Sequence, residues 1–323
     1  MNILITGVAG FIGFSLAKRL IYENKYNKIF GIDNVNSYYD IELKKNRLKV
    51  LKKNNNFFFY KVNLKSKIII DKLIKKNKIK VIIHLAAQAG VRFSIKNPDL
   101  YYESNILGFY NILELSKKNK IKHLLIASTS SVYGDCSKFP IQENFDSNKP
   151  LSFYAATKKS NEIVAYSYSS IFKLPITVMR FFTVYGPFGR PDMALFKITK
   201  SIFESKSFNV FNYGKHERDF TYIDDCTNYI SKLINKTPKN SIPYQIYNIG
   251  SNNPCKLMKF IKKIEKETNK ELKIKFTSKQ IGDVEKTHAS INKINKRVGK
   301  VQITDIAVGI NKFIEWYKSY YKV

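Results

Sequence analysis

The first part of the chain alternates short apolar runs with segments of helical periodicity, and this alternation restricts the fold more than any other feature. The runs are rich in β-branched and aromatic residues, and segments such as FIGFSLAKRLIYE between them repeat apolar residues with a helical period. Nearly continuous apolar strands separated by helices are typical of a parallel sheet covered on both faces. The sequence therefore predicts an α/β fold of the Rossmann type, with a doubly wound parallel sheet. The expected strands are 2–6, 28–32, 57–61, 80–86, 123–128 and 176–181.

The rhythm changes after about residue 185, where loops bearing Gly and Pro separate shorter elements. We interpret this part as a smaller C-terminal α/β domain that covers the carboxyl edge of the sheet. The expected domains are 1–185 and 186–323, and parts of 219–250 are expected to pack back on the first domain.

The chain of 323 residues has a net charge of +31, which raises the question of a polyanionic partner. Its lysines are scattered in short groups that follow apolar-periodic runs, as on solvated helix ends, and no basic stripe is interleaved with aromatic residues. We therefore expect no nucleic-acid partner.

The cysteine and histidine patterns indicate neither a disulfide framework nor a metal site. The three cysteines have no paired spacing, and the four histidines form no metal-ligand motif. No leader-like segment and no apolar run of membrane-spanning length is visible. We expect a cytoplasmic protein without membrane association.

The segment TGVAGFIG, which follows the first predicted strand, places Gly7, Gly10 and Gly13 at a turn and on the next helix. Glycines there permit a tight turn and close approach of backbone amides to a pyrophosphate. Asp33 ends the second strand, where a carboxylate can bind a ribose diol. The pattern predicts a dinucleotide site, and an acid at position 33 favours NAD over NADP.

Tyr154 and Lys158 are four residues apart in a predicted helix, so their side chains share one face. An ammonium group beside a phenol stabilises the phenolate. A tyrosine base near neutral pH needs its pKa lowered by about 3, which corresponds to about 4 kcal/mol. Lys158 and the positive charge of a nicotinamide are the expected sources. Thr129, Ser130 and Ser131 follow the fifth predicted strand, at the sheet edge where α/β proteins bind ligands.

Several motifs together resemble the extended short-chain dehydrogenase/reductase family of nucleotide-sugar enzymes, namely TGVAGFIG, HLAAQAGVR, STSSVYG and YAATKK. The segments 33–48, 84–98, 180–194, 218–225 and 282–289 resemble more closely the UDP-glucuronate 4-epimerases of that family. The resemblance covers essentially the whole chain.

The resemblance implies a redox-neutral inversion at C4 of UDP-glucuronate that gives UDP-galacturonate for a surface polysaccharide. Tyr154 would take the proton of the sugar O4 while hydride passes to bound NAD, and the hydride would return to the other face of the 4-keto sugar. Lys158 would also hold the nicotinamide ribose, and Thr129 would share the hydrogen bond to O4.

The resemblance also implies two sets of binding residues. The expected cofactor-binding set is Gly7, Gly10, Phe11, Ile12, Gly13, Asp33, Asn34, Asn63, Leu64, Leu85, Ala86, Ala87, Gln88, Asn105, Ser128, Tyr154, Lys158 and Phe181. The expected substrate-binding set is Gln88, Arg92, Thr129, Ser130, Ser131, Tyr154, Thr183, Arg190, Met193, Arg218 and Asp283. Asn63 stands where the family usually has an Asp near the adenine.

Within the substrate set, two serines distinguish this sequence from related dehydratases and decarboxylases, which carry acidic residues after the catalytic Thr. Ser130 and Ser131 offer no base to the sugar C5, and with Thr183 they are expected to hold the carboxylate. Arg190 is expected to close over the sugar. We expect Arg218 at the diphosphate, since a guanidinium matches phosphate oxygens, and Asp283 at the uridine ribose.

Two predicted helices, around 98–118 and 154–172, carry more apolar residues than one sheet contact would use. In the family the equivalent helices form a four-helix bundle across a two-fold axis, which implies a homodimer. The residues concerned are Tyr101, Tyr102, Ile106, Phe109, Tyr110, Leu113, Ile163, Tyr166, Tyr168, Ile171 and Phe172.

Two alternatives remain open at this point. A UDP-glucose or UDP-N-acetylhexosamine 4-epimerase, or another nucleotide-sugar epimerase of the family, would share the catalytic residues and differ around C6. A catalytically silent nucleotide-binding protein could instead use its basic surface to bind RNA.

Overall fold

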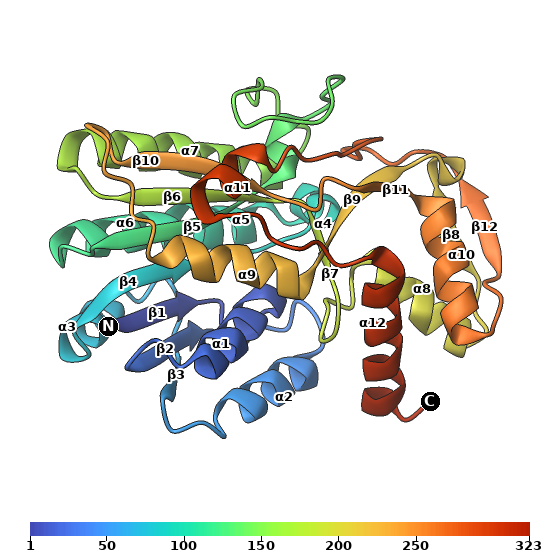
Figure 1. The fold of residues 1–323 in the computed structure, drawn as a ribbon, viewed down its shortest axis with the longest axis horizontal. Helices are drawn as coiled ribbons and strands as arrows, with labels where there is room; N and C mark the ends of the chain where they lie inside the picture. Colours follow the sequence, from blue (N-terminus) through green and yellow to red (C-terminus); the bar gives the residue numbers. More distant parts are fainter.

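The computed structural model describes residues 1–323, and its centre is a seven-stranded parallel sheet (Figure 1). The predicted doubly wound fold is confirmed, and each of the six expected strands matches an observed strand to within two residues at either end. The strand order reverses between β1 (Asn2–Thr6) and β4 (Ile79–His84). In order across the sheet, the strands are β3 (Phe57–Lys61), β2 (Lys28–Asp33), β1 (Asn2–Thr6), β4 (Ile79–His84), β5 (His123–Thr129), β6 (Ile176–Phe181) and β10 (Tyr244–Ile249).

Helices cover both faces of this sheet, as its apolar strands require. One buried cluster joins α1, α2 and α9 to one face, and a second joins α3, α6 and α7 to the other. The helices of the first face are α1 (Phe11–Glu23), α2 (Ile41–Leu51) and α9 (Ile223–Ile234), with α11 (Asn292–Val298) beside β10. Those of the second face are α3 (Lys67–Lys76), α6 (Gly108–Lys118) and α7 (Phe153–Phe172).

The remaining elements form a second lobe, which lies on the right in Figure 1. Its core is strongly aromatic: Phe220 stacks on Phe260 with ring centroids 4.1 Å apart, and Phe196 packs against Phe313. Its strands are β7 (Thr183–Tyr185), β8 (Phe208–Phe211), β9 (Glu217–Tyr222), β11 (Pro254–Lys256) and β12 (Ile274–Thr277). Its helices are α8 (Ala194–Phe203), α10 (Leu257–Thr268) and α12 (Ile306–Tyr321).

The chain passes between the two parts repeatedly. After β9 it returns to the large sheet, where α9 packs on α1 and β10 pairs in parallel with β6. It then leaves again for β11 and α10 and comes back at α11. The cleft between the two parts is therefore walled by segments far apart in the sequence.

The segment expected as one helix around 98–118 is divided into α5 (Pro98–Tyr101), a π-helical turn (Tyr102–Leu107) and α6. The wide turn brings Asn105 into the interior, where its side chain bonds to the backbone of Gln88. Tyr101, Phe109 and Leu113 are buried in the chain's own core, whereas Tyr102 and Tyr110 are exposed.

None of the helices combines the length and the apolar character that a membrane span requires. No group of three or more His, Cys, Asp or Glu side chains is placed to hold a metal ion.

Candidate active site

A cavity of about 1180 Å³ lies between the carboxyl ends of the sheet strands and the second lobe. This is the edge at which open α/β sheets bind ligands. Every residue of the two expected binding sets lines the cavity except Asn105. The structure thus brings together side chains from the first glycine turn to the segment around Asp283.

The glycine turn after β1 leaves its backbone open to a ligand. Gly7 has a φ of 73° and donates its N–H to the Ile32 carbonyl, 2.8 Å away. A Cβ on Gly13 would lie 2.2 Å from the Gly7 carbonyl oxygen, so only glycine permits helix α1 to approach the turn so closely. This cradle at a helix N-terminus fits the pyrophosphate of NAD.

Asp33 at the end of β2 fixes the loops on either side of the expected ribose site. Its carboxylate accepts hydrogen bonds from the N–H groups of Ala9 and Val35, at 3.0 and 2.8 Å. Burial raises the pKa of Asp33, and the nearby Lys44 ammonium acts against that rise. Lys44 lines the cavity, and burial lowers its pKa to about 8. Sequence reasoning included its segment in the resemblance but did not select Lys44.

Asn105 lies behind the cavity wall rather than in it. Its amide accepts from the Gln88 N–H at 2.8 Å, donates to the Gln88 carbonyl at 3.0 Å and donates to Thr157 Oγ1 at 3.1 Å. Asn105 therefore holds the backbone of a lining residue. Gln88 is buried, and its Nε2 has no hydrogen-bond partner within the chain.

Lys158 and Tyr154 occupy one face of α7, which begins where Ser152 accepts the Ala155 N–H at 3.1 Å. Lys158 Nζ donates to the Ala127 carbonyl at the end of β5, 2.9 Å away. Burial lowers the pKa of Lys158 to about 8. The lysine is thus held at the sheet edge by the backbone of the strand that also carries Thr129.

Burial and one nearby cation act on the pKa of Tyr154 in opposite directions. Burial raises it, while the charge of Arg190 and a hydrogen bond from Thr129 lower it only in part. The charge of Arg190 thus favours the phenolate form of Tyr154.

Thr129 ends β5, and Ser130 and Ser131 form a 3₁₀ turn with Val132 and Tyr133. The Ser131 N–H donates to Thr129 Oγ1, and the two hydroxyl oxygens lie 3.2 Å apart. The three hydroxyl side chains therefore stand together at the cavity wall, without an acidic neighbour in the turn.

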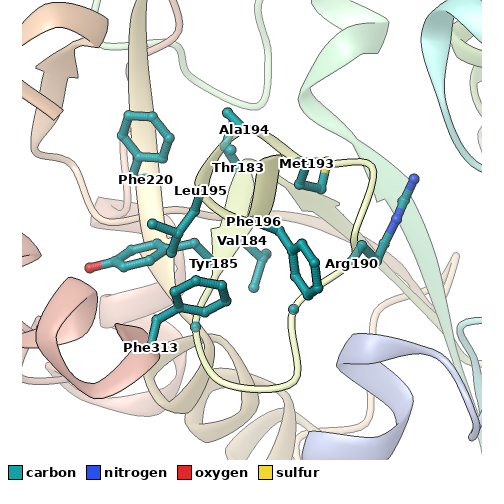
Figure 2. Close-up of a pocket in the computed structure, with 12 residues that line it drawn as sticks. Thr183, Val184, Tyr185, Arg190, Met193, Ala194, Leu195, Phe196, Phe220 and Phe313 are labelled. Carbon is teal, nitrogen blue, oxygen red and sulfur yellow. The ribbon is translucent and has the colours of Figure 1, made fainter. Parts of the chain in front are cut away.

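Arg190 lies on the loop between β7 and α8 and points away from the apolar cluster behind that loop, as Figure 2 shows. Its Nε and a terminal nitrogen donate to Asp192 at 3.0 and 2.5 Å. Asp192 also accepts the Tyr38 hydroxyl at 3.1 Å. Tyr38 and Asp192 line the cavity, and sequence reasoning did not select them.

The same loop is fastened to the glycine turn by Arg47, a fully buried side chain of α2. Arg47 donates to the Ala9 carbonyl at 2.8 Å and to the Phe188 carbonyl at 2.6 Å. One side chain thus connects the expected cofactor turn with the expected sugar loop. Sequence reasoning missed this link, because it joins segments 141 positions apart.

The far end of the cavity carries two arginines and one carboxylate. Arg92 pairs with Asp283 at 2.6 Å and lies over the Phe211 ring, 4.5 Å from its centroid. Arg218 donates to the backbone carbonyls of Val284 and Glu285, and burial lowers its pKa to about 10. Asp283, expected at a ribose, is thus engaged by Arg92 in this structure, and the cluster keeps a net positive charge.

The doubly wound sheet, the glycine cradle and the cavity at the carboxyl ends of the strands define a nucleotide-dependent enzyme of the Rossmann class. A model of the NAD dependent epimerase/dehydratase family matches residues 3–250. The chain belongs to that family.

Similar proteins point to one branch of it. The chain is 46% identical to Protein CapI of Staphylococcus aureus, with 100% of both chains covered. It is 40% identical to a UDP-glucuronate 4-epimerase of Thermodesulfobacterium geofontis, over 98% of this chain and 95% of that one. A crystal structure of UDP-glucuronic acid 4-epimerase from Bacillus cereus with UDP-glucuronic acid and NAD is similar at a TM-score of 0.93 and 34% identity, over 99% and 100% of the two chains.

Proposed function

We propose that this protein is an NAD-dependent UDP-glucuronate 4-epimerase, an isomerase that converts UDP-glucuronate to UDP-galacturonate. The observation that carries this proposal is the meeting of Thr129, Tyr154 and Lys158 at one cavity wall with the neutral side chains of Ser130 and Ser131. Full-length similarity to enzymes of that name supports the same substrate.

Tyr154 is the proposed base at the sugar O4. Bound NAD supplies the transient hydride acceptor and donor at C4. Tyr154 takes the O4 proton as C4 is oxidised and returns it after reduction from the opposite face, so one residue serves both half-reactions. Thr129 orients O4 through its hydroxyl, and Arg190 favours the phenolate by its charge.

Control of the product lies in what surrounds the sugar carboxylate. Oxidation at C4 makes the hexuronate a β-keto acid, which can lose carbon dioxide, and makes its C5 proton acidic. Ser130, Ser131 and Thr183 are proposed to hold the carboxylate through hydroxyl groups, which cannot act as bases near neutral pH. Arg190 closes over the sugar from the loop that precedes α8.

We further propose a division of labour between the two parts of the chain. Residues 1–185 bind NAD and residues 186–323 bind the nucleotide sugar, with Arg218 at the diphosphate and Asp283 near the uridine ribose. The return of α9 and β10 to the large sheet supports counting residues 223–249 with the first part.

A homodimer through a four-helix bundle is part of the proposal. Exposed apolar side chains on the π-helical turn, α6 and α7 support it, because such a cluster is costly to leave in water. The main members are Tyr102, Leu107, Tyr110, Ile163, Val164, Tyr166, Ile171 and Phe172. Three cysteines without a disulfide support a cytoplasmic location, and a glycosyl donor as product fits polysaccharide synthesis.

The test is to incubate the purified protein with UDP-glucuronate, with and without added NAD, while proton NMR follows the sugar and a trap collects carbon dioxide. We expect UDP-galacturonate as the sole product. Carbon dioxide with a UDP-pentose would show a decarboxylase, and turnover of UDP-glucose or UDP-N-acetylglucosamine alone would show a different sugar specificity.

A further inference from the structure

His216 is a buried histidine at the positive end of the cavity that neither the family motifs nor the proposed chemistry uses. His216 lines the cavity and is 5% exposed. Its Nε2 has no hydrogen-bond partner within the chain. A buried ring nitrogen without a hydrogen-bond partner lowers the stability of the folded chain, because its desolvation is not compensated. A ligand that forms this hydrogen bond would compensate it.

The backbone places His216 and Arg218 on the same side. His216 immediately precedes β9, and side chains two residues apart in extended chain point to one face. Both residues line the cavity, while Glu217 between them pairs with Lys286. The backbone around His216 is fixed, because its carbonyl accepts the Leu257 N–H at 2.8 Å.

The charged surroundings of His216 favour an anion. The charged groups that face it are Arg218 of β9, Arg92 of α4 (Val91–Lys96), and Lys279 and Asp283 of the segment after β12. Three of these four are cations, and Asp283 is paired with Arg92. Burial and the neighbouring cations hold the pKa of His216 below its usual value. The free site therefore disfavours the imidazolium form of His216 and holds unneutralised positive charge.

We propose that His216 is a further ligand of the substrate's diphosphate and that it binds an anionic oxygen together with Arg218. This inference rests on the proposed function insofar as the cavity takes a nucleoside-diphosphate sugar. An imidazole that donates Nε2–H to phosphate gains its missing partner. The arriving negative charge also favours the imidazolium form, so binding takes up a proton.

The sign of the pH effect follows from this linkage. The pKa of His216 is depressed in the free protein and rises on binding, so the complex holds more protons than the free protein between the two pKa values. Affinity therefore increases as the pH falls from about 8 to about 6.

The experiment measures the binding of UDP-glucose by calorimetry at these two pH values and in two buffers of different ionisation enthalpy. The diphosphate diester of this probe does not titrate in that range, unlike the terminal phosphate of UDP. We expect tighter binding and proton uptake in the wild type. His216→Gln should keep a donor but lose the pH dependence, and His216→Ala should weaken binding about tenfold.

His288→Gln is the matched control, because His288 bonds to Asn252 and does not line the cavity. It should retain the pH dependence of the wild type. A pH dependence that survives in His216→Gln, or unchanged affinity in His216→Ala with intact thermal unfolding, would overturn the assignment. Either result leaves the epimerase proposal standing, since the binding assay needs no turnover. Conversely, pH-linked binding by a protein that does not epimerise UDP-glucuronate would support the role of His216 at the diphosphate but not the proposed reaction.

Discussion

Arg180 on β6 donates two hydrogen bonds, of 2.9 and 2.6 Å, to the carboxylate of Glu162 on α7, and both side chains are only 2% exposed. Ser128 at the end of β5 donates a third bond to the same carboxylate. Glu162 lies one turn beyond Lys158, and its charge raises the pKa of that lysine against the effect of burial. The ion pair thus stands directly behind the proposed catalytic lysine.

Breaking this pair should destabilise the protein strongly. Glu162→Gln leaves the buried Arg180 charge without its partner, and we expect a loss of about 3–5 kcal/mol in the free energy of unfolding. Chemical denaturation monitored by circular dichroism measures it. The exposed pair of Lys45 and Glu42 is the control, and Glu42→Gln should cost under about 1 kcal/mol. A loss that small for Glu162→Gln would contradict the reasoning.

Tyr154→Phe should remove turnover and leave binding of UDP-glucuronate nearly unchanged. The phenol is the proposed base, and loss of a positioned base lowers kcat by about 10²–10⁴-fold. Rates from NMR and affinities from calorimetry separate the two effects. Weak binding together with low kcat would indicate that the hydroxyl serves mainly to hold the substrate.

The pH dependence of kcat should respond in opposite directions to two neighbours of Tyr154. The rate rises with pH as the phenolate forms, and the charge of Arg190 lowers the pKa of Tyr154. Arg190→Gln should therefore move the rise to higher pH. Asp192→Asn removes the carboxylate that offsets Arg190 and should move it to lower pH. Shifts of the same sign in both variants would rule out this electrostatic account.

Ser131→Glu should change the product. A carboxylate at this position offers a base near the sugar C5 and carboxyl group, so we expect carbon dioxide or a dehydrated by-product beside the epimer. Ser131→Gln is the control, because a Gln side chain has nearly the same shape as Glu but cannot act as a base. This variant should give the epimer alone, more slowly than the wild type. An unchanged product distribution in Ser131→Glu would refute the proposed product control.

Gly13→Ala should abolish NAD binding. The added Cβ would meet the Gly7 carbonyl at 2.2 Å, so the helix must move away from the turn, at a cost of about 1–3 kcal/mol in stability. Fluorescence titration with NAD and thermal unfolding measure the two effects. Ser15→Ala on the same helix is the control. If this variant lost as much NAD affinity and stability as Gly13→Ala, the losses could not be assigned to the close approach of Gly13 to Gly7.

Ile163→Glu with Tyr166→Glu should convert the proposed dimer to a monomer in sedimentation at micromolar concentration. Charges on the exposed face of α7 oppose burial of that face against a second copy. Tyr22→Glu on α1, at a side chain that is 90% exposed, should leave the assembly unchanged. A wild type that sediments as a monomer would remove the dimer from the proposal.

Six of the seven strands could be predicted because each is a short, mainly apolar run, as ITVMRF at 176–181 shows. The seventh, β10, was missed because YQIYNI mixes polar and apolar residues. The break in the helix around 98–118 could not, because the π-helical turn depends on the tertiary bonds of Asn105 to Gln88. Helical periodicity alone favours a continuous helix there.

Some residues of the cavity could likewise be predicted from the sequence, and others could not. Gly7, Tyr154 and Lys158 could be selected because they stand in short motifs of recognisable spacing. Arg47 gains its place only from contacts with Ala9 and Phe188, which no local pattern reveals. Asp192 was also missed, although the sequence carried a local signal for it. An acid two residues after Arg190 indicates a possible ion pair, which the structure contains.

The repeated passage of the chain between the large sheet and the second lobe has a consequence for how such enzymes diversify. The lobe is not a terminal cassette, because α9 and β10 interrupt it and belong to the large sheet. A single recombination event therefore cannot exchange the whole lobe for another without also replacing a strand of the sheet. Substitutions in the loops that line the cavity, such as the turn at Ser130 and Ser131, by contrast leave the path of the chain unchanged.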